Sequence, residues 1–309
     1  MSGGSEFQSW GAERLKALLP MVTSRAGGTV RWMEEEDLRE REEVAIQRQK
    51  DLDYVQEYQP LREDIKYLRV LLYGPVGAGK SSVINSVSTV LRGRITIPAL
   101  TCSLTCERYF TKKYATHKFS KGRGSSKTFY PVVFNDTRGL EDGNNSGIHP
   151  DNIKLALKGH VREGYKFNSE GKLTEDDFGY NPTPSASDRV HVLACVLSAN
   201  TPQINASVLQ KMKKVRETAS EQGIPQIGLM THIDSACNEI NKDLKNVYRS
   251  KHLYKKMKDF SSAVGIPLNC IFPIKNYSDE IEMNNDIDIL ILSALRKIID
   301  FGDDFIQKC

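Results

Sequence analysis

Apolar residues are distributed along this chain in two patterns, continuous runs and amphipathic repeats. Continuous apolar runs at residues 67–73, 132–135, 188–197, 227–231 and 268–274 are typical of strands that are buried on both faces of a sheet. Amphipathic repeats at residues 82–87, 153–161, 208–222, 238–258 and 286–301 predict helices. Strands that alternate with helices predict an α/β fold, with a mainly parallel sheet and helices on both faces.

The remaining segments suggest how the chain is organised. Residues 1–9 are small and linker-like, and we expect an expression scar or a disordered start there. Residues 10–66 predict a helical N-terminal extension that packs on a domain of residues 67–309; a helix that binds a partner or forms a dimer is the alternative. Clusters of Gly, Asn, Asp and Pro indicate an insertion at about residues 140–187. The basic residues between 112 and 127 predict a solvated hairpin, with an anionic-lipid or RNA site as the alternative.

A phosphate-binding loop follows the first apolar run. Its pattern is G-x-x-x-x-G-K-[ST], matched by Gly74, Pro75, Val76, Gly77, Ala78, Gly79, Lys80 and Ser81, with Ser82 next in the helix. Small residues let the backbone amides curl round a phosphate, and the start of the helix adds its positive dipole end. Lys80 is expected between the β- and γ-phosphates, and the Ser81 hydroxyl on Mg²⁺. The sequence therefore predicts a P-loop fold that binds a nucleotide.

A second motif, D-x-x-G, ends the apolar run at residues 132–135. Asp136 is expected to hold Mg²⁺ through water, and the Gly139 amide to meet the γ-phosphate. A threonine between the two motifs is expected to complete the metal site. Thr96, Thr101 and Thr105 are the candidates, and spacing favours Thr101. The predicted metal ligands are thus Ser81, Thr101 and Asp136.

A third motif predicts which base is bound. Residues Thr231, His232 and Asp234 follow another apolar run and are close to the [NT]-K-x-D pattern of GTPases. A carboxylate accepts hydrogen bonds from the guanine N1–H and exocyclic amine, whereas adenine offers no matching donors. His232 departs from the usual lysine, which weakens the prediction of guanine affinity. After the last apolar run, a backbone amide near Lys275 or Asn276 is expected to reach the guanine carbonyl.

Hydrolysis is expected to be slow. Leu140 follows Gly139, where many small G proteins place a glutamine that orients the attacking water, and leucine cannot do this. Val76 replaces a glycine that admits an arginine finger in Ras-like proteins. Arg138 is a candidate to act in cis or across a dimer, with an ordinary surface charge as the alternative. The candidate catalytic residues are Lys80, Thr101, Arg138 and Gly139.

Together the motifs resemble one family more closely than GTPases in general. The segments at 74–82, 136–140 and 231–234 and the run Pro273-Ile274-Lys275-Asn276-Tyr277 are similar to the interferon-induced protein 44 family, and the likeness covers about residues 60–309. The resemblance implies a cytoplasmic, interferon-inducible protein with a GTP-binding domain, acting in antiviral or innate immune regulation. It also implies protein partners in immune signalling.

Two other classes of function compete with a slow GTPase that binds GTP, GDP and Mg²⁺. One is a nucleotide-dependent scaffold with negligible hydrolysis, which changes partners, or forms a homodimer, as its switches order. The other is an ATPase or small-molecule kinase that shares only the P-loop, and the Thr231–Asp234 motif argues against it.

Composition agrees with an intracellular α/β protein. The chain has 309 residues, of which 39% are hydrophobic and 27% charged, enough for one large domain with additions. Its six cysteines are scattered without a C-x-x-C pair, so we expect reduced thiols rather than disulfides or zinc. No apolar run approaches the roughly 20 residues of a membrane span. The net charge of +4 is too small to indicate nucleic-acid binding.

Overall fold

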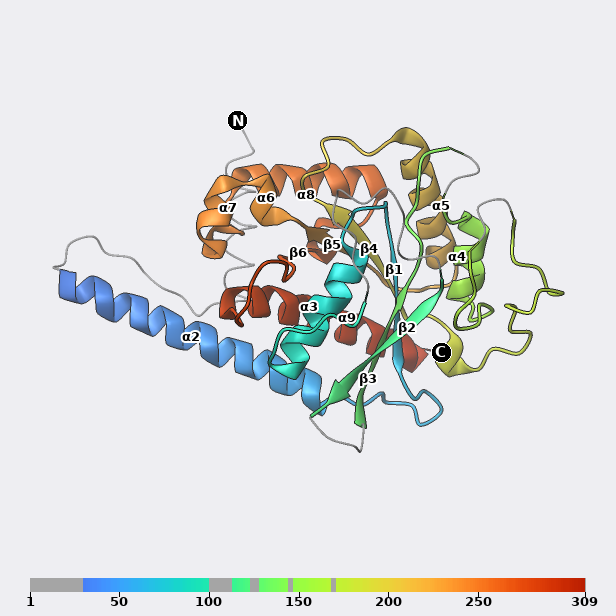
Figure 1. Cartoon of the computed structure of the whole chain (residues 1–309), viewed down its shortest axis with the longest axis horizontal. Coiled ribbons are helices and arrows are strands. Elements are labelled where there is room, and N and C mark those ends of the chain that lie inside the picture. The colour runs from blue at the N-terminus through green and yellow to red at the C-terminus, as the bar shows by residue number, and fades with distance from the viewer. Residues whose placement is uncertain (1–29, 100–112, 123–127, 144–146, 168–170, 309) are drawn as a thin grey trace.

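A six-stranded sheet forms the centre of the molecule (Figure 1). The computed structural model describes residues 30–99, 113–122, 128–143, 147–167 and 171–308, with side chains described from residue 42. The strand order is β2-β3-β1-β4-β5-β6. The strands are β1 (Leu68–Tyr73), β2 (Ala115–Lys121), β3 (Thr128–Asp136), β4 (Val192–Ser198), β5 (Gln226–Thr231) and β6 (Ile271–Pro273). Only the β2–β3 pair is antiparallel among these strands, so the predicted mainly parallel sheet and the predicted hairpin are both confirmed.

Helices cover both faces of the sheet, as the alternating pattern predicts. One face packs against α4 (Pro150–Leu157), α5 (Ala206–Glu221) and α8 (Lys251–Val264). The other packs against α3 (Lys80–Arg92) and α9 (Asn285–Lys308). Within β1, Leu71 and Tyr73 enter the first core, whereas Val70 and Leu72 enter the second. A strand buried on both sides has to be apolar at nearly every position, which is why its sequence shows no alternation.

The described part of the N-terminal extension, residues 30–66, contains one long helix, α2 (Val30–Glu57), which runs beside α9 (Figure 1). The described part of the helix packs on α9, as expected, and Val55 is fully buried. The expectations for residues 1–9 and for Thr101 and Thr105 lie outside the described residues. None of the described helices combines the length and the apolar character needed to cross a bilayer.

Three predicted elements differ from those observed. The expected helix at 238–258 is divided into α7 (Asn238–Lys242), a 3₁₀ turn (Leu244–Asn246) and α8, because the side chains of Asp243 and Ser250 cap new helical starts, and a separate short helix, α6 (Ile233–Ala236), precedes it. The expected strand at 268–274 begins with a 3₁₀ turn after Pro267, so only Ile271–Pro273 pairs in the sheet.

The predicted end of the last helix at residue 301 is also wrong, because α9 continues to Lys308. A glycine at position 302 favours a helix end in the sequence, but here it serves close packing. A Cβ on Gly302 would lie 2.5 Å from Leu68 Cδ1 and 2.9 Å from Val192 Cγ2. A larger residue at this position would therefore have to displace the side chains of Leu68 and Val192.

Candidate functional site

The P-loop joins β1 to α3 at the carboxyl edge of the sheet. Gly74, Gly77 and Gly79 have φ values of 146°, 76° and 89°, a backbone region that residues other than glycine rarely occupy. A Cβ on Gly74 would also lie 2.1 Å from the carbonyl oxygen of Val196. The backbone of the loop thus requires its glycines, and α3 begins directly at Lys80 with its amide end at the loop.

Lys80 lies inside the loop, with only 7% of its surface exposed. Its Nζ donates to the carbonyl oxygens of Gly74, at 3.2 Å, and Pro75, at 3.0 Å. Burial lowers the pKa of the ammonium, and the nearby Asp136 carboxylate opposes that shift. The loop therefore holds a buried positive charge, which a phosphate group would neutralise.

Two of the three predicted metal ligands lie together. The Ser81 hydroxyl donates to Asp136 Oδ2 at 2.6 Å, and Asp136 is 2% exposed at the end of β3. In the described part of the chain no group of three or more His, Cys, Asp or Glu side chains is placed to hold a metal. One hydroxyl and one carboxylate beside a phosphate site fit Mg²⁺, which takes its other ligands from phosphate and water. Thr96, the described threonine candidate, is instead buried, and its hydroxyl donates to Ser88 at 2.9 Å.

The D-x-x-G segment contacts the P-loop directly. The Leu140 amide donates to the Gly74 carbonyl at 3.0 Å, and the Val76 amide donates to the Leu140 carbonyl at 3.2 Å. A Cβ on Gly139 would lie 2.5 Å from Val76 Cγ2. Leu140 is buried, at 1% exposure, and Arg138 donates two hydrogen bonds to Glu141 Oε1, each of 3.1 Å. In this conformation Gly139 is packed on Val76, and Arg138 is paired within its own segment.

The predicted base-recognition motif is joined to the P-loop by a buried hydrogen bond. The fully buried Thr231 hydroxyl donates to the Ala78 carbonyl at 2.7 Å. His232 has a φ of 54°, the single positive value among the described residues other than glycine. Burial lowers the pKa of its imidazole and Asp234 opposes this, so the ring is neutral near pH 7. This turn after β5 directs the chain into Asp234 at the same edge of the sheet as the P-loop.

Asp234 takes part in an ion-pair group that the sequence did not reveal. Lys275 Nζ lies 3.9 Å from Asp234 Oδ2 and 2.7 Å from Glu280 Oε1. Burial raises the pKa of Glu280, but hydrogen bonds from Lys275 and the Ser278 amide outweigh it and leave the pKa below its usual value. Lys275 is therefore held beside the carboxylate that is expected to read the base. Glu280 lies in a polar loop without a recognisable motif, so no sequence signal identified it.

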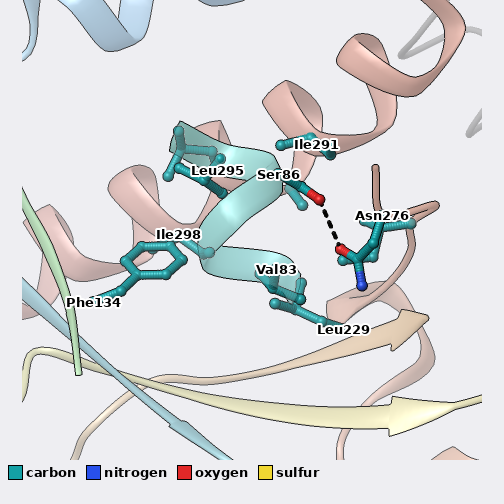
Figure 2. Close-up of a pocket in the computed structure, with 11 residues that line it drawn as sticks. Val83, Ser86, Phe134, Leu229, Asn276, Ile291, Leu295 and Ile298 are labelled. Atoms are coloured by element: carbon teal, nitrogen blue, oxygen red, sulfur yellow. Dashed lines mark hydrogen bonds between the residues drawn. The ribbon is translucent and has the colours of Figure 1, made fainter. Parts of the chain in front are cut away.

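Asn276 lies against α3, near the start of the P-loop helix. Its Oδ1 accepts from the Ser86 hydroxyl at 3.2 Å, as Figure 2 shows, above the apolar side chains of Val83 and Leu229. A Cβ on Gly79 would lie 3.1 Å from Asn276 Nδ2. That Nδ2 atom is buried and has no hydrogen-bond partner among the described residues. A buried N–H without an acceptor costs about 1–3 kcal/mol, so a ligand acceptor at this point would be stabilising.

The fold and these loops define a P-loop α/β protein whose motifs lie along one sheet edge in the order of a GTPase. By sequence, the chain is 33% identical over 273 residues to interferon-induced protein 44 from Mus musculus, which covers 88% of this chain and 63% of that protein. It is 31% identical over 254 residues to interferon-induced protein 44-like from Homo sapiens, which covers 82% of this chain and 55% of that protein. The chain is therefore a relative of the interferon-induced protein 44 and 44-like proteins, and the resemblance carried by its motifs is confirmed.

The chain was also compared with models of protein families and with solved structures. Compared with models of known protein families, the chain has no match. A solved structure of Toc33 from Arabidopsis thaliana in complex with GDP and Mg²⁺ aligns with 82% of this chain and 91% of its own, at 16% identity and a TM-score of 0.46. The chain spans 55% to 63% of the length of the two relatives given above.

Proposed function

We propose that this chain binds guanine nucleotides, GTP and GDP, together with Mg²⁺. The observation that carries the proposal is the Thr231–Ala78 hydrogen bond, which joins the predicted base-reading segment to the predicted phosphate loop. Strands β1 and β5 run parallel in one sheet, so Lys80 and Asp234, which follow them, are presented along one edge of the sheet, as a nucleotide that spans both requires. The domain organisation remains our proposal as well: residues 67–309 form the nucleotide-binding unit, with an insertion at about 140–187 and the extension at 10–66.

Each residue has a defined task in this proposal. Lys80 turns from the Gly74 and Pro75 carbonyls to the β- and γ-phosphates, and the loop amides and the start of α3 hold the β-phosphate. Ser81 and Asp136 hold Mg²⁺, which neutralises charge on the phosphates when it is bound. Asp234 accepts from the base, and the Asn276 side chain or a backbone amide beside it donates to the guanine carbonyl.

We further propose that hydrolysis is slow. Leu140 is buried and has no group that orients water, and Arg138 is engaged by Glu141. The second candidate is a scaffold that binds nucleotide with negligible hydrolysis. The burial of Leu140 and the pairing of Arg138 with Glu141 favour this candidate as well. A single-turnover assay with GTP distinguishes the two, because a slow GTPase releases phosphate at a measurable rate and the scaffold retains GTP.

Calorimetric titration with GDP, GTP and ATP in Mg²⁺ tests the proposal. We expect binding that is selective for guanine and is lost in Lys80→Ala, which removes the ammonium. Asp234→Asn should shift the preference toward xanthine nucleotides, because an amide donates where the carboxylate accepts. Equal binding of ATP, or unchanged GTP binding in Asp234→Asn, would remove the guanine assignment.

The relatives' names contain the words "interferon-induced". We propose that this chain is likewise interferon-induced, and that it acts in the cytoplasm in an antiviral or innate immune response, with immune-signalling proteins or a second copy of itself as partners. Quantifying its transcript with and without interferon tests the first part of this proposal. An unchanged transcript level would refute it.

A further inference from the structure

A continuous set of hydrogen bonds connects residues 275–278, which we call the base-recognition loop, to the N-terminal helix. Tyr277 directly follows Lys275 and Asn276, and its amide donates to the Ser86 hydroxyl at 3.0 Å. The Tyr277 hydroxyl donates to Asp288 Oδ1 at 2.7 Å and accepts from the Asn284 amide at 2.8 Å. Tyr277 is 9% exposed. The loop is thus held between α3 and the start of α9, and Figure 2 shows the hydrogen bond between Ser86 of α3 and Asn276 of the loop.

Asp288 is the central group of this connection. It is completely buried, and its second oxygen, Oδ2, accepts from Arg48 Nε of α2 at 2.6 Å. A buried carboxylate is tolerated only when it is paired and hydrogen-bonded. Arg48 supplies the positive charge, and Tyr277 supplies a neutral donor. Asp288 therefore keeps its full set of partners only while α2 is docked and the loop is in place.

From these contacts we infer that Arg48 is a positioning residue for the base-recognition loop, and that α2 docking and guanine-nucleotide binding are energetically linked through Asp288 and Tyr277. The part of this inference that concerns guanine nucleotide rests on the proposed function. The link from α2 to the loop rests only on the contacts described above. If docking of α2 orders the loop, a nucleotide that orders the loop must favour docking by the same factor. The extension is then a part of the site that senses nucleotide rather than an attached spacer.

The same helix pair provides a matched control. Asp51 of α2 is 3% exposed and accepts from Arg296 of α9 at 2.8 Å. This second pair also joins α2 to α9 and also neutralises a buried carboxylate. Among the described residues, no hydrogen bond or ion pair joins Asp51 or Arg296 to the base-recognition loop. Removing either arginine therefore weakens α2 docking in a similar way, but only the loss of Arg48 disturbs Asp288.

The test compares Arg48→Met, Arg48→Lys and Arg296→Met in the full chain. GDP affinity is measured by calorimetry, and amide hydrogen exchange is followed in the free protein for residues 275–278. We expect Arg48→Met to weaken GDP binding about tenfold, within the usual range of coupling between sites. It should also speed exchange in the loop. Arg48→Lys restores a cation to Asp288 and should recover most of both losses, and Arg296→Met should leave both near the wild-type values.

The outcomes separate the two proposals. Equal effects of Arg48→Met and Arg296→Met on affinity and on loop exchange would show that α2 acts through general stability, and would overturn the inference. No effect of Arg48→Met on loop exchange would overturn it as well. If the wild-type chain binds no guanine nucleotide, the proposed function fails. The exchange comparison still decides in that case whether α2 controls the loop.

Discussion

Thr231→Val tests the contact that joins the two halves of the candidate site. Threonine and valine have nearly the same shape, so the substitution leaves little cavity and removes one hydroxyl. The Thr231 hydroxyl is fully buried and donates to the Ala78 carbonyl at 2.7 Å. Without this donor, the Ala78 carbonyl of the P-loop loses a buried hydrogen bond. We expect the free energy of unfolding to fall by about 1–3 kcal/mol, the cost of a buried polar group that loses its partner.

The same substitution should weaken nucleotide binding. Ala78 belongs to the P-loop. Without the Thr231 hydroxyl, a smaller fraction of molecules holds the P-loop beside the end of β5. A fall of about tenfold in GDP affinity corresponds to about 1.4 kcal/mol, within the expected loss of stability. Denaturant unfolding and GDP calorimetry on the same preparations give both quantities.

Thr218→Val is the matched control for this experiment. Thr218 is also buried, at 6% exposure, and its hydroxyl donates to the Lys214 carbonyl at 3.0 Å within α5. That carbonyl is part of the regular helix, so the hydroxyl is a secondary partner and its loss should cost less. We expect a smaller stability loss and unchanged GDP affinity. If Thr231→Val loses no more stability than Thr218→Val and binds GDP as the wild type does, the Thr231 contact does not hold the site together.

Three further predictions concern separate features of the structure. Gly74→Ala should prevent folding, as judged by circular dichroism, because its Cβ would meet the Val196 carbonyl at 2.1 Å at a φ of 146°; a folded variant would show that the loop can move away. Gly139→Ala should destabilise the protein by about 1–3 kcal/mol in denaturant unfolding, and adding Val76→Gly should restore only part of this, because the Val76 nitrogen at 2.7 Å remains. Burial lowers the pKa of His191 to about 4, so the folded state requires the neutral ring; stability is complete above about pH 6.5 and should fall by up to about 3 kcal/mol as the pH drops toward 4. His191→Gln should reduce that slope, and an unchanged slope in unfolding experiments at pH 7 and 5 would contradict the prediction.

The sequence was sufficient for the parts of the fold that depend on local pattern. Continuous apolar runs located the central strands, and the glycine spacing located the P-loop, because both are imposed by the backbone itself. The pattern was insufficient where tertiary contacts decide the structure. Gly302 would end a helix if α9 were isolated, but close packing on Leu68 and Val192 makes it a helix interior.

The candidate site was predicted in the same uneven way. Ser81, Asp136 and Thr231 follow known motifs, and the structure brings Ser81 to Asp136 and Thr231 to the P-loop. Lys275 and Arg138, in contrast, are held by residues that belong to no motif: Glu280 pairs with Lys275, and Glu141 pairs with Arg138. A single polar residue in a loop carries no periodic signal, so such partners are visible only once the chain is folded.

The N-terminal helix α2 shows why partners that belong to no motif matter for function. Its sparse apolar positions were compatible with a helix that packs on the domain and with one that binds a partner. In the folded chain its contact with the domain combines apolar packing, through the buried Val44 and Val55, with charge, since Arg48 and Asp51 each pair with a charged residue of α9. Ion pairs of this kind add little net stability when intact but are costly to break on one side only. The two pairs therefore favour one register of α2 on α9, and the inference above predicts that a ligand that displaces Tyr277 from Asp288 also weakens the contact between the two helices.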